Sequence, residues 1–211
     1  MKQPAKQFNI ILASGSPRRV EMLQSLGLKF EVLPADVDET VTPGITPPDL
    51  VSSLALSKAQ RVEEIIKERQ KTAEHDILII AADTVVALGM EILGKPINRD
   101  DAIETLKALS GKAHQVFTGV SYLHLDKDLN RVAHIEQTDE TEVFFRDLDI
   151  DEITSYVDTA EPMDKAGAYA LQGIGAFMVS KINGCPANVK GLPTPLVVQQ
   201  LRQFGILVMG L

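Results

Sequence analysis

Apolar and polar residues alternate along the chain in two ways, as short continuous apolar runs and as strictly alternating stretches. The continuous runs predict buried strands, and the alternating stretches predict strands with one exposed face. Six segments fit one of these patterns: FNIILA (8–13), FEVLPADV (30–37), DILIIAADTVVAL (76–88), HQVFTGVSYLHL (114–125), IEQTDETEVFFR (135–146) and AFMVSKI (176–182). The segments 114–125 and 135–146 are expected to pair with each other in antiparallel fashion.

Helix start signals lie between these runs. Ser16 and Pro17 predict a helix directly after the first strand, and Thr46 with Pro47 predicts a long helix that ends near Gln70. Asn98 is expected to cap another helix, and shorter helices are expected near 150–158 and from about 194. Since helices interleave with strands, the chain is predicted to be an α/β protein with a mixed sheet.

Composition limits the possible partners. The chain has 211 residues, 45% of them hydrophobic, which allows one sizeable domain over 1–211 or two small lobes that share a cleft. Its net charge of −8 argues against a nucleic-acid polymer as partner.

The only cysteine is Cys185, which excludes an intrachain disulfide and a Cys-based metal site. The apolar run at 8–13 is too short for a signal peptide and no later stretch could span a bilayer, so we expect a cytoplasmic protein with no membrane partner.

Two adjacent arginines stand at the start of the first predicted helix, although the chain as a whole is acidic. In ILASGSPRRVEML, Arg18 and Arg19 fall in the first turn, where the helix dipole favours negative charge. A bound anion would resolve the conflict, because helix N–H groups and guanidinium groups can bind phosphate oxygens together.

Asp83 interrupts an otherwise apolar strand. A lone buried carboxylate is costly, so Asp83 must be paired, bound to a metal ion or placed at an exposed strand end. One interpretation is an aspartate that caps a turn at the strand end. The other is a general base or metal ligand at the edge of a cleft.

Two lysines, Lys58 and Lys95, could each lie at the surface or contact an anion in a cleft. Lys58 lies on the apolar face of its predicted helix, where it could extend its ammonium group to water or toward an anion in a cleft. Lys95 follows the phosphate-loop spacing in GMEILGKP, but Pro96 replaces the Ser or Thr that would ligate magnesium, so a phosphate loop is excluded. GMEIL instead predicts a hairpin tip, with Lys95 either at the surface or in contact with phosphate. The segment DKAGAYALQGIG (164–175) could be a mobile loop or a close approach of backbone to a ligand.

Eight short motifs follow one another in an order that resembles the Maf nucleotide pyrophosphatases. They are ASGSPRR, DET, SxxKA, AADTVV, GKP, LSGxxHxVxTGV, EPxDKAGAYxxQGxG and NVxGLP, and together they cover roughly residues 8–205. The resemblance implies hydrolysis of a nucleoside triphosphate to the monophosphate and pyrophosphate, with a divalent metal cation (Mg or Mn). It also implies a mixed, curved sheet flanked by helices, two lobes around a deep cleft as in the related inosine-triphosphate pyrophosphatases, and a homodimer.

The resemblance also assigns roles to individual positions. It implies that Asp83 is the catalytic base, with Glu39 beside it on a metal ion or a water molecule. The positions that resemble specificity determinants are Arg18, Thr84 and Gln172. Those that would line the phosphate end of the cleft are Ser14, Arg19, Lys58 and Lys95.

The AADT motif with DKAGAY and Gln172 is similar to the subgroup that acts on dTTP and UTP. Gln172 is expected to read the base, because one amide can meet the N3–H donor and the O4 acceptor of uracil or thymine. Ala170 replaces a glycine found in many relatives, and CPAN (185–188) departs from the family's usual turn. Two alternatives stay open, a nucleotide-binding regulator of cell division with incidental hydrolysis, and a purine pyrophosphatase of the inosine-triphosphate type.

Overall fold

A computed structural model describes residues 7–41 and 44–208. The strands are β1 (Phe8–Leu12), β2 (Glu31–Val32), β3 (Asp76–Leu88), β4 (Glu91–Leu93), β5 (Ala113–Leu125), β6 (Arg131–Phe145) and β7 (Val179–Asn183). The helices are α1 (Pro17–Gln24), α2 (Pro47–Arg69), α3 (Arg99–Leu109), α4 (Ile150–Val157), α5 (Pro186–Val189) and α6 (Thr194–Gln203). Three short 3₁₀ turns are η1 (Glu161–Asp164), η2 (Ala166–Ala168) and η3 (Ile174–Met178).

All of these strands join one sheet in the order β2-β1-β3-β5-β6-β7, and β4 pairs with part of β3. The pairs β1–β2 and β1–β3 are parallel, whereas the other neighbours are antiparallel. The predicted α/β class with a mixed sheet flanked by helices is therefore confirmed.

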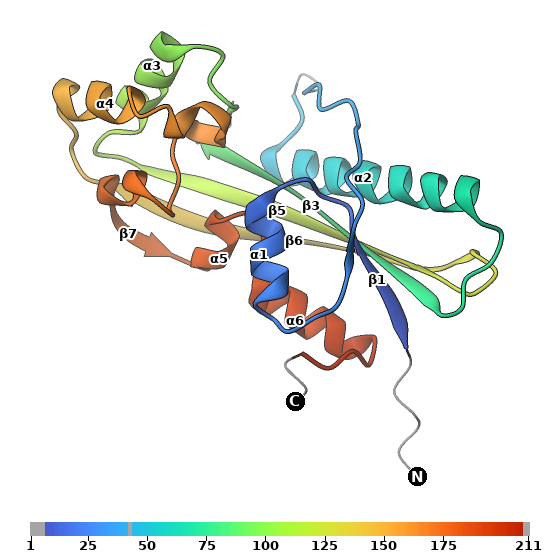
Figure 1. Cartoon of the computed structure of the whole chain (residues 1–211). Coiled ribbons are helices and arrows are strands. Elements are labelled where there is room, and N and C mark those ends of the chain that lie inside the picture. Colours follow the sequence, from blue (N-terminus) through green and yellow to red (C-terminus); the bar gives the residue numbers. More distant parts are fainter. Residues whose placement is uncertain (1–6, 42–43, 209–211) are drawn as a thin grey trace.

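Period-two alternation in β3 divides the core between two faces of the sheet. Ile77 and Ile79 point to the face that α2 covers, while Leu78 and Ile80 point to the face that α1 and α6 cover (Figure 1). A third apolar cluster lies under α3 and α4 at the other end of the long strands, and Val86 of β3 belongs to it. The same long strands therefore support both halves of the molecule.

Local signals explain the helices that position the site. The Thr46 hydroxyl accepts a hydrogen bond from the Asp49 amide, so α2 begins where its cap predicts, and it ends at Arg69. Ser16 and Pro17 begin α1, although the Ser16 side chain makes no capping hydrogen bond. Across the described ranges, none of the helices has the length and apolar character needed to cross a bilayer.

Two predicted strands are shorter than expected. Only Glu31 and Val32 of the segment 30–37 pair with β1, because β1 itself ends at Leu12 and offers no further edge. The last strand begins at Val179 rather than 176, since residues 174–178 form the turn η3. The helical turn α5 was not predicted.

Candidate functional site

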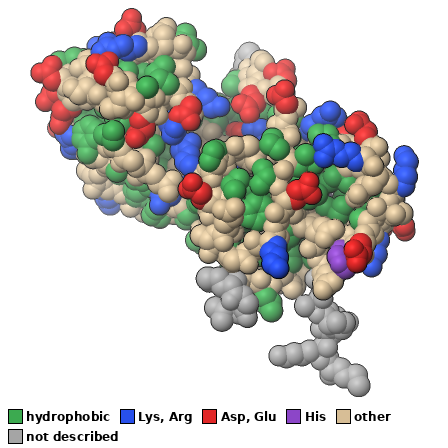
Figure 2. Space-filling view, in the orientation of Figure 1, with side chains coloured by type: hydrophobic (Ala, Val, Ile, Leu, Met, Phe, Trp, Pro, Cys, Tyr) green, Lys and Arg blue, Asp and Glu red, His purple; other side chains and the backbone are tan. Residues whose placement is uncertain are grey.

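A gap along one edge of β3 forms the main cleft. β1 pairs with β3 only as far as Ile80, and β4 begins to pair at Val86. Between these two points, the chain leaves β1 through residues 13–16 and enters α1. The resulting cleft of about 600 Å³ lies at the carboxyl end of a parallel strand, which is where open α/β sheets bind ligands. Lys and Arg side chains gather where the two halves of the molecule meet (Figure 2).

Lys58 bridges two carboxylates inside this cleft. Its Nζ atom lies 2.6 Å from Asp83 Oδ1 and 2.6 Å from Glu39 Oε1. The Lys58 and Asp83 side chains are each only 11% exposed, whereas the Glu39 side chain is 51% exposed on the rim. The hydrogen bond from Lys58 lowers the pKa of Glu39 despite some opposing burial, so Glu39 is ionised at neutral pH. The ammonium of Lys58 thus lies in the cleft, and its extension to bulk water is excluded.

Asp83 occupies the middle of its strand. It lies opposite Gly119 of β5, and β3 continues for five more residues to Leu88. The interpretation of Asp83 as a turn cap at a strand end is therefore wrong. Its carboxylate can face the cleft because neither β1 nor β4 pairs with β3 at this position.

Arg19 is anchored by three oxygen atoms of the protein. Its Nε donates to the Gly191 carbonyl at 2.8 Å, its Nη2 to Thr84 Oγ1 at 3.0 Å and its Nη1 to Ser14 Oγ at 3.4 Å. Arg18 makes no such side-chain contact within the described ranges, so its guanidinium is available to a ligand. The two neighbouring arginines therefore differ: protein oxygens fix Arg19, whereas Arg18 lines the cleft without such a bond.

Thr84 belongs to a polar chain that runs beneath the cleft. Its hydroxyl contacts Thr118 Oγ1 at 2.9 Å, and Thr118 donates to the Asn188 carbonyl at 3.2 Å. Asn188 is fully buried and donates through Nδ2 to Thr141 Oγ1 at 3.0 Å. Because hydrogen bonds from both sides hold the Thr84 hydroxyl, its position in the cleft is fixed.

The structure brings most of the predicted site residues together. The cleft lining contains Ser14, Arg18, Arg19, Glu39, Lys58, Asp83, Thr84 and Lys95. Gln172 is outside this set and exposed to solvent, so the structure does not bring it to the cleft. Its role as the reader of the base stays a prediction.

Two cleft lysines were missed by the sequence analysis. Lys165 and Lys190 both line the cleft and raise its cations to six, against the three carboxylates of Glu39, Asp83 and Asp164. A chain with net charge −8 thus carries a cationic cleft, which suits an anionic ligand. No periodic pattern distinguishes these lysines from ordinary surface lysines.

The carboxylates of Glu39 and Asp83 are suitable donors for a divalent cation. Within the described ranges, no group of three or more His, Cys, Asp or Glu residues could hold a metal ion. Mg²⁺ in phosphate-binding sites commonly uses one or two carboxylates and completes its shell with water and phosphate oxygens. The two cleft carboxylates fit that arrangement.

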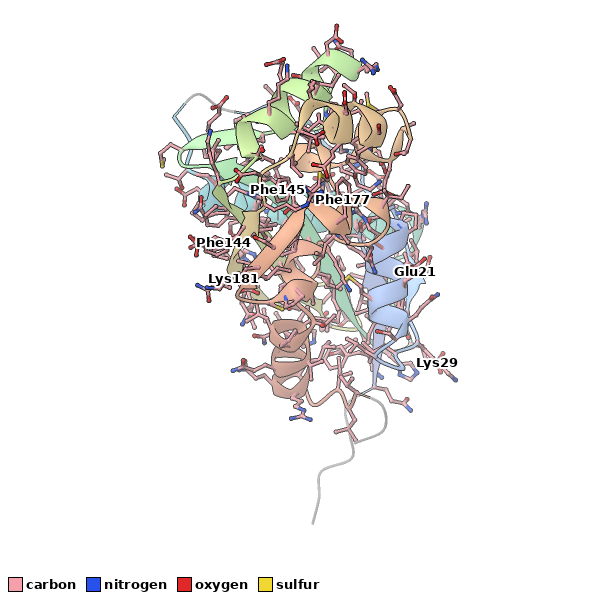
Figure 3. All side chains as sticks on the ribbon, turned by 90° about the vertical axis from the view of Figure 1, so that its left-hand side faces the viewer. Glu21, Lys29, Phe144, Phe145, Phe177 and Lys181 are labelled. Carbon is pink, nitrogen blue, oxygen red and sulfur yellow. The ribbon has the colours of Figure 1, made fainter. Side chains whose placement is uncertain are left out.

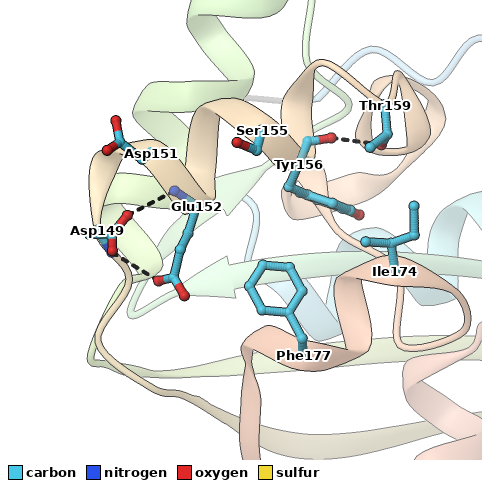
Figure 4. A pocket seen from close by; sticks show the side chains of 8 residues that line it. All are labelled: Asp149, Asp151, Glu152, Ser155, Tyr156, Thr159, Ile174 and Phe177. Carbon is cyan, nitrogen blue, oxygen red and sulfur yellow. Dashed lines mark hydrogen bonds between the residues drawn. The ribbon is translucent and has the colours of Figure 1, made fainter.

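A second pocket of about 410 Å³ lies between α4 and η3, outside the cleft (Figure 4). Its lining includes the carboxylates of Asp149, Asp151 and Glu152 and contains no Lys or Arg. These charges disfavour an anionic ligand, so the cleft beside β3 is the candidate functional site.

Comparisons with known proteins agree with the motifs. The family model described as "Maf-like protein" matches residues 9–204. A "dTTP/UTP pyrophosphatase" of Desulforamulus reducens is 45% identical over 197 residues, which are 93% of this chain and 97% of that protein. A protein of the same description from Pelotomaculum thermopropionicum is 44% identical and covers 93% of this chain and 96% of its own. Among solved structures, the Staphylococcus aureus Ham1 protein is 14% identical over 66% of this chain and 72% of that one, with a TM-score of 0.39.

Proposed function

The chain belongs to the family of Maf-like proteins, and we propose that it is a nucleoside triphosphate pyrophosphatase that acts on dTTP and UTP. It releases the nucleoside monophosphate and pyrophosphate. The observation that carries the proposal is the Lys58 bridge between Asp83 and Glu39 in a cleft with six cations. A carboxylate beside a phosphate-binding cluster provides both a base and a place for the triphosphate.

In the proposed reaction, water attacks the α-phosphorus and the bond to the bridging α,β-oxygen breaks. Asp83 orients the water and accepts its proton, and Lys58 fixes the position of the Asp83 carboxylate. Arg18, Lys58 and Lys95 stabilise the charge that develops on the pyrophosphate. When bound at Glu39 and Asp83, a divalent cation (Mg²⁺ or Mn²⁺) supplies further charge neutralisation on the phosphates.

A nucleotide-binding regulator of cell division is the rival proposal. Binding alone requires the cations of the cleft but does not require a carboxylate among them. The buried Asp83 therefore favours the enzyme. A homodimer and a cytoplasmic location remain part of the proposal, and neither affects the chemistry.

The test is a panel of nucleoside triphosphates with Mg²⁺, in which the released pyrophosphate and monophosphate are quantified. We expect multiple turnovers with UTP and dTTP and slower turnover with CTP, ATP, GTP and ITP. Asp83→Asn keeps the shape but removes the base, so turnover should fall by roughly 100-fold or more.

Asp76→Asn is the matched control, since Asp76 is a buried aspartate of the same strand that lies outside the cleft. It should retain turnover in the folded protein. Release of orthophosphate would contradict the reaction, and stoichiometric binding without product would favour the regulator. A preference for ITP would favour the purine enzyme.

A further inference from the structure

One carboxylate closes the loop that forms a wall of the cleft. Glu161 precedes this loop, and its two oxygens accept hydrogen bonds from the backbone at the far end of it. The Gly175 amide donates to Oε1 at 2.9 Å and the Ile174 amide donates to Oε2 at 3.1 Å. Tyr156 of α4 adds a third bond, from its hydroxyl to Oε1 at 3.0 Å. Residues 162–173 therefore form a loop whose base is held by a single side chain.

The body of this loop faces the ligand site. Asp164, Lys165, Ala166 and Tyr169 line the cleft. Two further bonds fix the inner side of the loop: the Gly167 amide donates to the Gly94 carbonyl at 3.0 Å, and the Tyr169 hydroxyl contacts His114 Nε2 at 2.9 Å. Glu161 holds the other side through its bonds to Tyr156 and Ile174. Both of these residues line the second pocket (Figure 4).

The glycines of this loop are explained by the same carboxylate. Gly173 has φ +99°, and a Cβ atom there would lie 2.5 Å from Glu161 Oε2. At Gly175, a Cβ atom would lie 2.7 Å from the Tyr156 hydroxyl. Any side chain at these positions would displace the groups that close the loop. The QGIG sequence thus permits the close approach of Glu161 and Tyr156.

Glu161 is a charged acceptor in this arrangement. Partial burial opposes ionisation, but the hydrogen bonds from Gly175, Ile174 and Tyr156 outweigh it and lower the pKa of Glu161. Hydrogen bonds to an ionised acceptor are roughly twice as strong as neutral ones. The carboxylate therefore holds the loop more firmly than a neutral amide of the same shape could.

We propose that Glu161 is a positioning residue for the nucleotide, and this inference rests on the proposed function. By fixing the base of the loop, Glu161 sets the place of Lys165 and Tyr169 in the cleft that the cations of α1 and α2 also line. Gln172 lies in the short span between the buried Ala170 and the amides that Glu161 binds. If Gln172 reads the base as predicted, its place also depends on this carboxylate.

Glu161→Gln tests the inference because the amide keeps the size but offers one acceptor oxygen to two backbone donors. We expect KM for UTP to rise about 10-fold, kcat to fall less than threefold, and the preference for UTP over CTP to shrink. Hydrogen exchange of residues 162–175 should become faster. Tyr156→Phe removes one of the three donors and should shift the same quantities in the same direction by less, which keeps the test decisive if Glu161→Gln folds poorly.

Glu152→Gln is the matched control. Glu152 also binds a backbone amide, that of Asp149 at 3.1 Å, and it pairs with Arg146 in the same half of the molecule, but it does not line the cleft. It should lower stability without a change in KM or base preference. Faster exchange in Glu161→Gln with unchanged KM and preference would overturn the inference, as would equal kinetic shifts in both variants. Failure of the proposed function would instead be visible in the unmodified protein, as absent pyrophosphate release.

Discussion

Lys190 lies in the cleft at a position that its motif leaves variable. It occupies the variable position of NVxGLP, next to the Gly191 carbonyl that Arg19 binds, and it lines the cleft. Within the described ranges, Lys190 forms no ion pair, whereas Lys165 pairs with Asp164. An unpaired ammonium in a half-buried position remains available to a phosphate oxygen.

Replacement of Lys190 by glutamine should therefore weaken substrate binding. A half-exposed charge contact contributes about 1 kcal/mol, which corresponds to roughly a fivefold rise in KM for UTP. We expect kcat to change little, because within the described ranges Lys190 makes no hydrogen bond or ion pair with Asp83 or Lys58. Steady-state kinetics at low ionic strength measures the effect.

Lys181→Gln is the control for that variant. Lys181 lies on β7 outside the cleft, with its ammonium 5.1 Å from the centre of the Phe144 ring (Figure 3). Loss of this charge should leave KM unchanged. Equal KM values for all three proteins would show that Lys190 does not contact the triphosphate.

At the scale of elements, the contact between α2 and β5 determines where Lys58 lies. Gly119 of β5 faces the start of α2 so closely that a Cβ atom there would lie 2.4 Å from the Val51 carbonyl oxygen and 2.8 Å from the Ser52 amide nitrogen. Both contacts are with backbone, which cannot rotate away as a side chain could. The glycine of the TGV motif thus permits α2 to approach the sheet.

Gly119→Ala should push α2 away from the sheet. Overpacking of this kind costs about 1–3 kcal/mol, so the free energy of unfolding measured in urea should fall by that amount. Turnover should fall as well, because α2 carries Lys58. Gly94→Ala is the stability control, since an added methyl group there meets open space. If both variants are equally stable, the close approach at Gly119 does not limit the packing of α2.

The sequence predicted correctly the elements that an apolar run or a helix cap defines by itself, such as β3 and the start of α2. The apolar run 76–88 became β3 with the same ends, and the Thr46 cap began α2 where expected. The predicted length of the strand at 30–37 was wrong, because the length of a strand depends on the neighbouring strand with which it pairs. That neighbour, β1, ends at Leu12. Similarly, the motifs indicated most of the cleft, but whether Lys165, Lys190 and Gln172 reach it depends on loop geometry that no local pattern encodes.

For the whole molecule, a buried histidine makes stability depend on pH. His114 is fully buried between Phe145 and Tyr169, and burial lowers its pKa from 6.5 to about 4. Well above pH 6.5, the ring is neutral in both the folded and the unfolded chain. Below that pH, His114 of the unfolded chain binds a proton, whereas the buried ring of the folded protein stays neutral. Stability therefore declines as the pH falls from 6.5 towards 4.

The contribution of His114 to this decline is on the order of 2–3 kcal/mol at pH 4.5. His114→Gln should be less stable at pH 7, but its free energy of unfolding should fall less between pH 7 and pH 4.5. Urea denaturation at both pH values provides the comparison. His75→Gln, outside the core, should retain the full decline. Parallel profiles for His114→Gln and the unmodified protein would rule out His114 as its source.

The bond from Arg19 to Gly191 joins two residues 172 positions apart in the chain. During synthesis, the first wall of the cleft emerges from the ribosome long before the carbonyl that anchors it has been made. Until then, the guanidinium of Arg19 lacks one of its three acceptors and α1 has no tie to the turn before α6. The cleft is therefore complete only after Gly191 has been made. A chain that ends before that glycine would lack both the carbonyl that anchors Arg19 and the apolar residues of α6 that pack on the sheet.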